Sequence, residues 1–218
     1  HITRSTNKRM TGLMEESSER SRGHGKIVEW SNLKLRLQRW FINHGHVKNK
    51  NTRDKIAHEY SYCFSDVAIE QMTFFEKVHF YQARYWLHYL LLDMLACRAI
   101  ANEWVVLYRE SPKVIDEDVD SYLHALHSLL IATYYLSDLP TFSTTRDQLE
   151  RFVAKNKKSI NENSRILAFL YTHLAQINEC FIAGDLKEAL QRLPEIEKGI
   201  QIFEKRLDPH KVHLFYYK

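Results

Sequence analysis

The sequence has few of the residues that make turns. Of its 218 residues only 6 are glycine and 4 are proline, against 12 tyrosines and 11 phenylalanines. A β-sandwich or β-barrel needs a turn about every 8–12 residues, and this chain cannot supply them. Because 44% of the residues are hydrophobic, the chain can bury a sizeable core, and general disorder is excluded as well.

Cysteines and long hydrophobic runs are also scarce. The three cysteines, Cys63, Cys97 and Cys180, are odd in number and far apart, which favours a reduced intracellular protein over a disulfide framework. The most apolar window, residues 78–100, is interrupted by five charged or histidine residues, so no run approaches the ~18 apolar residues of a membrane span. Residues 1–12 lack the apolar region of a secretory signal. We therefore expect a cytoplasmic protein without a membrane segment.

Positive charge is concentrated at one end of the chain. Residues 1–55 contain 13 lysines and arginines and only 5 acidic residues, although the whole chain has a formal charge of +4. A basic end is typical of proteins with a nucleic-acid or acidic-protein partner. It is equally the composition of a solvated helical surface, and the sequence leaves both interpretations open.

Helical periodicity runs through long segments, and no segment shows the sustained alternation of a strand. Residues 109–112 and 207–209 are predicted helix ends, each with a proline at its close. Residues 116–118 and 161–164 are predicted helix starts, because their acidic and Asn side chains can accept bonds from free backbone N–H groups. The expected helices fall into two alternating sets, A near 26–44, 74–91, 118–136, 161–182 and from 210 onward, and B near 52–68, 94–110, 141–155 and 186–206, with an opening helix near 9–22.

Four short junctions between these helices resemble one another. Taking His46, Asp93, Asp138 and Asp185 as equivalent gives spacings of 47, 45 and 47 residues, which predicts a helical hairpin repeated about every 46 residues. The end of the chain begins a further unit, because residues 211–213 repeat the Lys-Val-His of residues 77–79. We therefore expect the single domain of residues 1–218 to be a piece of a longer repeat protein, since terminal repeats normally carry polar caps.

The repeat register predicts which helix positions pack together. Ten residues before each junction stand Arg36, Ala83, Ser128 and Ala175, and three small residues in four suggest close helix crossings. Four residues before each junction stand Ile42, Tyr89, Tyr134 and Phe181. This apolar and aromatic column is expected to belong to the shared core.

The segment Ala183-Gly184-Asp185-Leu186-Lys187-Glu188-Ala189-Leu190 resembles the turn and second-helix start of the tetratricopeptide-repeat-like (TPR-like) superfamily. In that family the glycine permits the tight turn and the later alanine lets the helices pack closely. The resemblance implies a right-handed α-solenoid of antiparallel helix hairpins, here about four to five repeats of ~46 residues. It also implies a non-catalytic scaffold that binds a protein or peptide in a concave groove lined by the A helices.

No motif in the sequence indicates an enzyme or a metal site. Gly-x-Ser-x-Gly, His-Glu-x-x-His and Gly-x-Gly-x-x-Gly are all absent. His124-x-x-His127 and His210-x-x-His213 each place two imidazoles on one helical face, but neither pair has further ligands at a matching spacing. We therefore expect no catalytic activity, no cofactor and no metal.

One register of the A helices is rich in hydrogen-bonding and aromatic side chains. Fourteen residues before each junction stand Asn32, His79, His124 and Tyr171, and further positions on the same face carry Arg39, Gln82, Trp86, His127 and Asn178. In a concave groove such a column could hold an extended peptide, pairing its amides while apolar pockets select its side chains. The alternative is that these residues pair with each other between neighbouring helices.

Overall fold

The computed structural model describes residues 25–65, 67–157 and 159–204, and all the regular secondary structure of these residues is helical, with no strand among them. The predicted all-α class is therefore confirmed. The chain divides into two compact units, His1–Ala96 and Cys97–Lys218, and helix α4 carries the boundary. The expected helices at 9–22 and from 210 onward, and the helix end at 207–209, lie outside the described residues.

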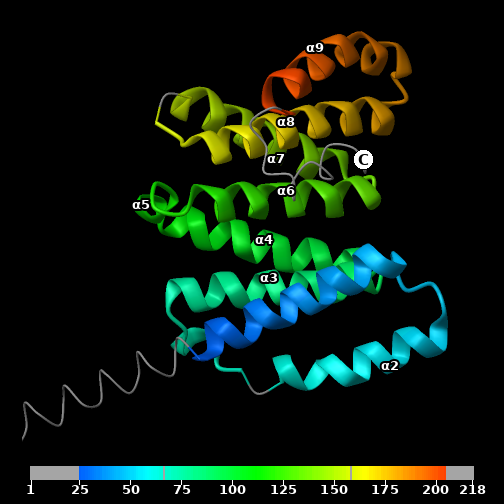
Figure 1. Ribbon diagram of the computed structural model, residues 1–218, viewed down its shortest axis with the longest axis vertical. Coiled ribbons are helices and arrows are strands. Elements are labelled where there is room, and N and C mark those ends of the chain that lie inside the picture. The colour runs from blue at the N-terminus through cyan, green and yellow to red at the C-terminus, as the bar shows by residue number, and fades with distance from the viewer. Residues whose placement is uncertain (1–24, 66, 158, 205–218) are drawn as a thin grey trace, which may run out of the picture. The chain divides into compact units, whose positions relative to one another are not determined.

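The first unit contains a helix over residues 25–44, then α2 (Lys50–Ser61), α3 (Phe74–Leu90) and the start of α4 (Met94–Glu110) (Figure 1). Two short 3₁₀ turns, η1 (Tyr62–Phe64) and η2 (Ile69–Gln71), lie between α2 and α3. The side chain of Thr73 caps the N-terminus of α3 in a reciprocal pair with Glu76, which satisfies two backbone donors at once.

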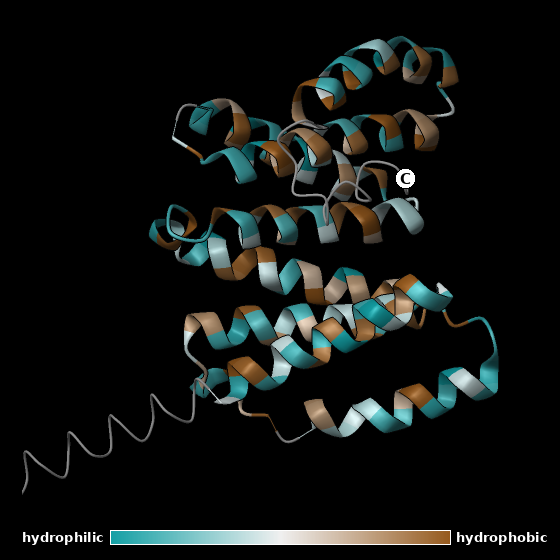
Figure 2. Cartoon of the chain, viewed as in Figure 1, coloured by the Kyte–Doolittle hydropathy of each residue, from teal (hydrophilic) through white to brown (hydrophobic). Residues whose placement is uncertain are grey.

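The second unit contains the rest of α4, the single turn α5 (Pro112–Ile115), α6 (Val119–Tyr135), α7 (Leu139–Asn156), α8 (Glu162–Ala183) and α9 (Leu186–Glu204). Helix α6 packs against α7 and α8, α7 also packs against α8, and α8 packs against α9. Each of these helices carries polar and apolar residues (Figure 2), as expected for helices with one buried face.

The predicted helix starts and ends agree with the structure to within a few residues, except that the helix expected near 52–68 is observed as α2, which ends at Ser61 and is followed by the 3₁₀ turn η1. Asn161 caps α8 by accepting a bond from the backbone N–H of Ser164 at 2.8 Å. Asp118 is the N-cap of α6, but its carboxylate accepts the hydroxyl of Tyr108 at 2.8 Å instead of a backbone N–H. Helix α5 was not expected, because Pro112 marks the end of α4 in the sequence and also starts this extra turn.

All four predicted junctions contain a residue with left-handed backbone conformation directly before the junction residue. The φ angles are 73° at Gly45, 57° at Leu92, 53° at Ser137 and 74° at Gly184. Only two of the four are glycines, the residue for which this conformation carries no steric cost. A left-handed residue therefore recurs at the predicted spacing, even at Leu92 and Ser137, where the sequence has no glycine.

Three of these turns are followed by an aspartate that serves both helices. The backbone N–H groups of Asp93, Asp138 and Asp185 donate to carbonyls five residues earlier at 2.8–2.9 Å, which closes the preceding helix. Their carboxylates accept a backbone N–H three residues later at 3.0–3.3 Å, which caps the next helix. Hydrogen bonds from Thr141 hold the pKa of the Asp138 carboxyl below its usual range.

The expected core column of Ile42, Tyr89, Tyr134 and Phe181 is wrong at two of its positions. The side chain of Ile42 is 71% exposed and that of Phe181 is 51% exposed. In α8 the buried stripe runs through Tyr171, Ala175 and Asn178, and Phe181 lies about a quarter turn away from it. Of the small-residue column, Ala83 and Ala175 are buried.

Replacing Ser137 by glycine should stabilise the second unit. Its left-handed backbone strains any residue that has a Cβ, so Ser137→Gly should raise the free energy of unfolding by about 0.5–1 kcal/mol in urea titrations. Ser137→Ala keeps the Cβ and is the matched control, with no such gain expected. A Ser137→Gly variant that unfolds more easily than the wild type would contradict the assigned turn.

Candidate functional site

Helix α3 presents a half-buried face that carries three of the predicted groove residues. His79, Gln82 and Trp86 are spaced three and four residues apart, so they lie along one side of the helix. The hydroxyl of Ser31 lies 3.0 Å from His79 Nδ1, and Lys34 Nζ donates to Gln82 Oε1 at 2.8 Å. The helix over residues 25–44 thus orients the polar side chains of this α3 face.

The C-terminal end of the α3 face adjoins an aromatic cluster made of Phe41, His46, Trp86 and Tyr89. The Trp86 ring lies edge-on to Phe41 and Tyr89, with centroids 5.9 and 5.5 Å apart. The left-handed turn at Gly45 brings His46 back onto the cluster, where its ring lies 4.7 Å from that of Tyr89. The His46 Nδ1–H donates to the Tyr89 carbonyl at 2.9 Å.

Burial lowers the pKa of two groups beside this surface. It lowers the pKa of the Lys34 amine, whose hydrogen bond to Gln82 carries no compensating negative charge. Burial also lowers the pKa of His46, and the nearby Lys48 charge acts in the same direction, while its backbone hydrogen bonds oppose them. His46 is therefore neutral at pH 7, and the aromatic cluster is uncharged.

Two other predicted residues of the first unit lie on a different side of the same helix. Asn32 and Arg39 are exposed. Around the helix axis Asn32 is about 100° from Ser31 and Arg39 is about 160° from Phe41, and Ser31 and Phe41 are two of the residues that meet α3. The structure therefore does not bring Asn32 and Arg39 together with the α3 face.

In the second unit three of the four predicted residues, His124, His127 and Tyr171, meet where α6 contacts α8. The ring of His127 stacks on that of Tyr171 with centroids 3.8 Å apart and planes at 3°, and His124 meets the same ring edge-on at 5.7 Å. Tyr171 and Asn178 are only 5% and 9% exposed, and burial raises the pKa of the Tyr171 hydroxyl. The half-buried His127 and the exposed His124 are thus the side chains that reach the surface.

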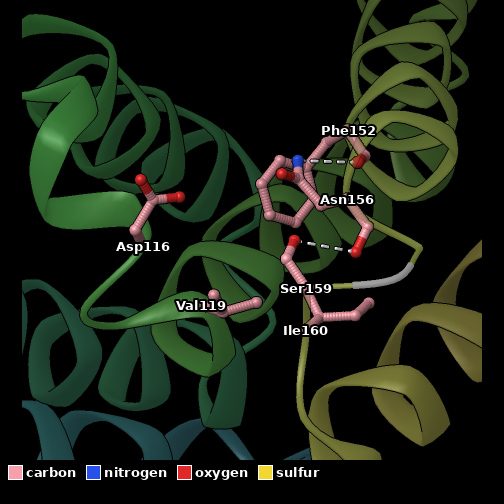
Figure 3. A pocket seen from close by; sticks show the side chains of 6 residues that line it. All are labelled: Asp116, Val119, Phe152, Asn156, Ser159 and Ile160. Atoms are coloured by element: carbon pink, nitrogen blue, oxygen red, sulfur yellow. Dashed lines mark hydrogen bonds between the residues drawn. The ribbon is translucent and has the colours of Figure 1, made fainter.

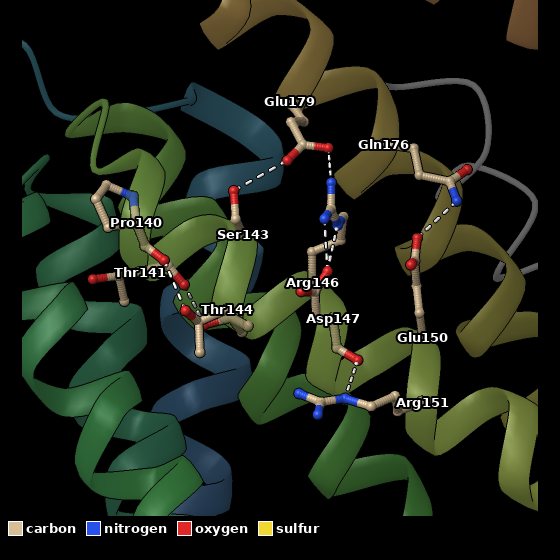
Figure 4. A network of polar contacts seen from close by, with 11 residues as sticks. Pro140, Thr141, Ser143, Thr144, Arg146, Asp147, Glu150, Arg151, Gln176 and Glu179 are labelled. Atoms are coloured by element: carbon tan, nitrogen blue, oxygen red, sulfur yellow. Dashed lines mark hydrogen bonds and ion pairs between the residues drawn. The ribbon is translucent and has the colours of Figure 1, made fainter.

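The supporting residues were not found by sequence reasoning. Ser31 and His79, like Lys34 and Gln82, are 48 residues apart, close to the repeat length, so comparing positions one repeat apart would have paired them. A polar network between α7 and α8 was also missed (Figure 4). In it Glu179 binds Arg146 and accepts the Ser143 hydroxyl, and Gln176 donates to Glu150 at 2.8 Å.

A pocket of about 300 Å³ lies in the second unit (Figure 3), lined by Asp116, Val119, Phe152, Asn156, Ser159 and Ile160. The Asn156 amide donates to the Phe152 carbonyl at 2.9 Å, and the Ser159 hydroxyl donates to the Asn156 carbonyl at 3.1 Å. These polar groups therefore hold the end of α7 together. Within the described residues no three His, Cys, Asp or Glu side chains gather as a metal site would require.

No family model, curated protein or solved structure matches this chain. Among the described helices, α8 alone is long and apolar enough to cross a membrane, and 33% of its most apolar stretch is buried. Its apolar residues Ile166, Leu167 and Ala168 are buried, and the helix packs against α6, α7 and α9.

The neutral state of His46 predicts how stability depends on pH. Because its pKa is lower in the folded than in the unfolded chain, its contribution is full above about pH 6.5 and is lost as the pH falls below that value. His46→Gln should therefore reduce the decline in unfolding free energy between pH 6.5 and 5. The decline should not vanish, since burial also lowers the pKa of His88 and His173. Urea titrations of both proteins at each pH, referenced to pH 7.5, measure this, and an unchanged slope would contradict it.

Proposed function

We propose that this chain is a non-catalytic, TPR-like helical-repeat scaffold that binds a protein or peptide in a groove along its A helices. The recurrent left-handed turn supports the repeat part of this proposal, because it stands one residue before each of the four predicted junctions. The contacts between neighbouring A helices support it too. They join residues about one repeat apart, as in Ser31 with His79 and His124 with Tyr171.

The observation that carries the binding proposal is the α3 face together with the aromatic cluster. Its side chains are half-buried, so each offers surface to a ligand while neighbouring contacts hold its rotamer. Preorganised side chains lose little conformational entropy when they bind. Tryptophan and tyrosine are also the types that most often dominate binding energy, and Trp86 and Tyr89 stand here side by side.

The chemistry of this surface fits an extended peptide. The Gln82 carboxamide can exchange hydrogen bonds with a peptide amide, and Trp86 offers a large apolar contact about one turn further along the same helix. A peptide residue advances about 3.3 Å in an extended strand, so a segment of a few residues spans from His79 to Trp86. The cytoplasm suits this role, because all three cysteines are free and two of them are buried.

Trp86→Ala should weaken peptide binding with little loss of helicity. Peptides selected from a random display library on the wild-type chain should bind the variant at least about tenfold more weakly, as expected for an interface anchor. His124→Ala tests the second unit in the same way. The matched control is Trp40→Ala, since Trp40 is also half-buried but contacts His44 outside the aromatic cluster. Failure to enrich any peptide, or equal binding by both tryptophan variants, would contradict the proposal.

A nucleic-acid role for the basic N-terminal section is the second candidate, and α2 is the observation that favours it. This helix buries only Ile56 and exposes Lys50, Arg53 and Lys55. Because α2 packs so little against the rest of the chain, its charged side chains are available to solvent or to a polyanion such as a nucleic acid.

Binding of fluorescent single- and double-stranded DNA and RNA at several salt concentrations separates the two candidates. If α2 contacts phosphates, affinity should fall steeply between 50 and 200 mM salt, by roughly tenfold or more for a few contacts, and Arg53→Ala with Lys55→Ala should flatten this dependence. If nucleic-acid binding is absent, or is unchanged by both substitutions, the nucleic-acid candidate is wrong and the peptide-binding scaffold is the candidate that stays.

A further inference from the structure

The helix over residues 25–44 carries an exposed apolar stripe opposite its core face. Val28, Leu35 and Ile42 are 58%, 56% and 71% exposed and follow one another at intervals of seven residues. The side chains that this helix buries in the core are Trp30, Leu33 and Leu37. They are at most 5% exposed and lie on the opposite side of the helix. A seven-residue apolar period is the pattern by which one helix packs along another.

Two polar residues lie between the apolar residues of this stripe. Asn32 and Arg39 are both exposed, and Arg39 forms no hydrogen bond or ion pair with any residue that the structure describes. The stripe contains no carboxylate. Arg39 thus offers a guanidinium that can donate hydrogen bonds. Asn32, which precedes Leu35 by about one turn, offers a carboxamide oxygen that can accept them.

We propose that the stripe is a self-association surface, on which a second copy of this chain lays the same helix antiparallel about a twofold axis at Leu35. Val28 and Ile42 are each seven residues from Leu35, so Val28 of each copy would meet Ile42 of the other. Asn32 and Arg39 are three and four residues from Leu35 on opposite sides. The Arg39 guanidinium of each copy can therefore donate to the Asn32 carbonyl oxygen of the other.

The charges near the axis are compatible with this pairing. The two Arg39 residues would stand about 12 Å apart along the helices, which is beyond the screening length at physiological salt. Arg36 lies nearer the axis, but its guanidinium is held 5.7 Å from the Tyr60 ring centroid and so is directed toward α2. The positions of Arg39 and Asn32 on either side of Leu35 thus place a donor and an acceptor so that they pair across the twofold axis, which favours a second copy over an unrelated partner.

A substitution at the axis tests the association. Sedimentation velocity of the full chain should show a concentration-dependent dimer up to about 200 µM, since interfaces as small as one helix pair are weak. Leu35→Glu should leave a monomer with an unchanged melting temperature, because the side chain is already exposed. Leu95→Glu, at a 69% exposed leucine on α4, should still dimerise. A wild-type chain that stays monomeric, or a Leu35→Glu variant that dimerises, would overturn the proposal.

Two experiments test the antiparallel register: cross-linking between copies, and the introduction of one carboxylate next to Arg39 of the other copy. In a Cys63→Ser background, Leu35→Cys should cross-link between copies through a short bis-maleimide, whereas Leu95→Cys should not. Asn32→Asp places a carboxylate opposite Arg39 of the other copy and should tighten the dimer by roughly threefold to tenfold. Equal cross-linking at both positions would overturn the antiparallel register. The proposal would also be overturned if the thiol of the Leu35→Cys variant were protected from maleimide in dilute monomer, which would mean that residues 1–24 cover the stripe.

Discussion

The turn in which an aspartate follows a left-handed residue is the constraint on which the rest of this structure depends. At Asp93, Asp138 and Asp185 the backbone N–H closes one helix and the carboxylate opens the next. Because both helices are bound to the same residue, the angle and separation at which they leave the turn are set locally.

This local constraint explains how the chain forms four such turns with glycine at only two of the left-handed positions. Leu92 and Ser137 take a conformation that costs roughly 1–2 kcal/mol for a residue with a Cβ. The hydrogen bonds of the turn and the packing of the flanking helices offset that cost. The turn at Gly45 differs, since the following His46 bonds to the Tyr89 carbonyl and the cap of α2 is supplied three residues later by Asn49.

Lateral contacts between A helices form the candidate binding surface. On the α3 face they leave His79, Gln82 and Trp86 half-buried and oriented by Ser31, Lys34 and Phe41. At the α6–α8 contact the same kind of pairing buries Tyr171 beneath His127. One sequence register thus provides surface side chains at some positions and internal packing at others, depending on which neighbouring helix covers each position.

The sequence by itself determined the helices and their turns, because these depend on interactions within a few residues. Capping by Asn161 and apolar periodicity are local properties, and the spacing of His46, Asp93, Asp138 and Asp185 marks the turns. Only the tertiary structure decided which side chains are exposed. Ile42 and Phe181 belong to the same sequence column as the half-buried Tyr89 and Tyr134, and Asn32 and Arg39 were grouped with residues of another surface. The physical reason is that exposure depends on which neighbouring helix covers a given face, and no periodicity within a single helix contains that information.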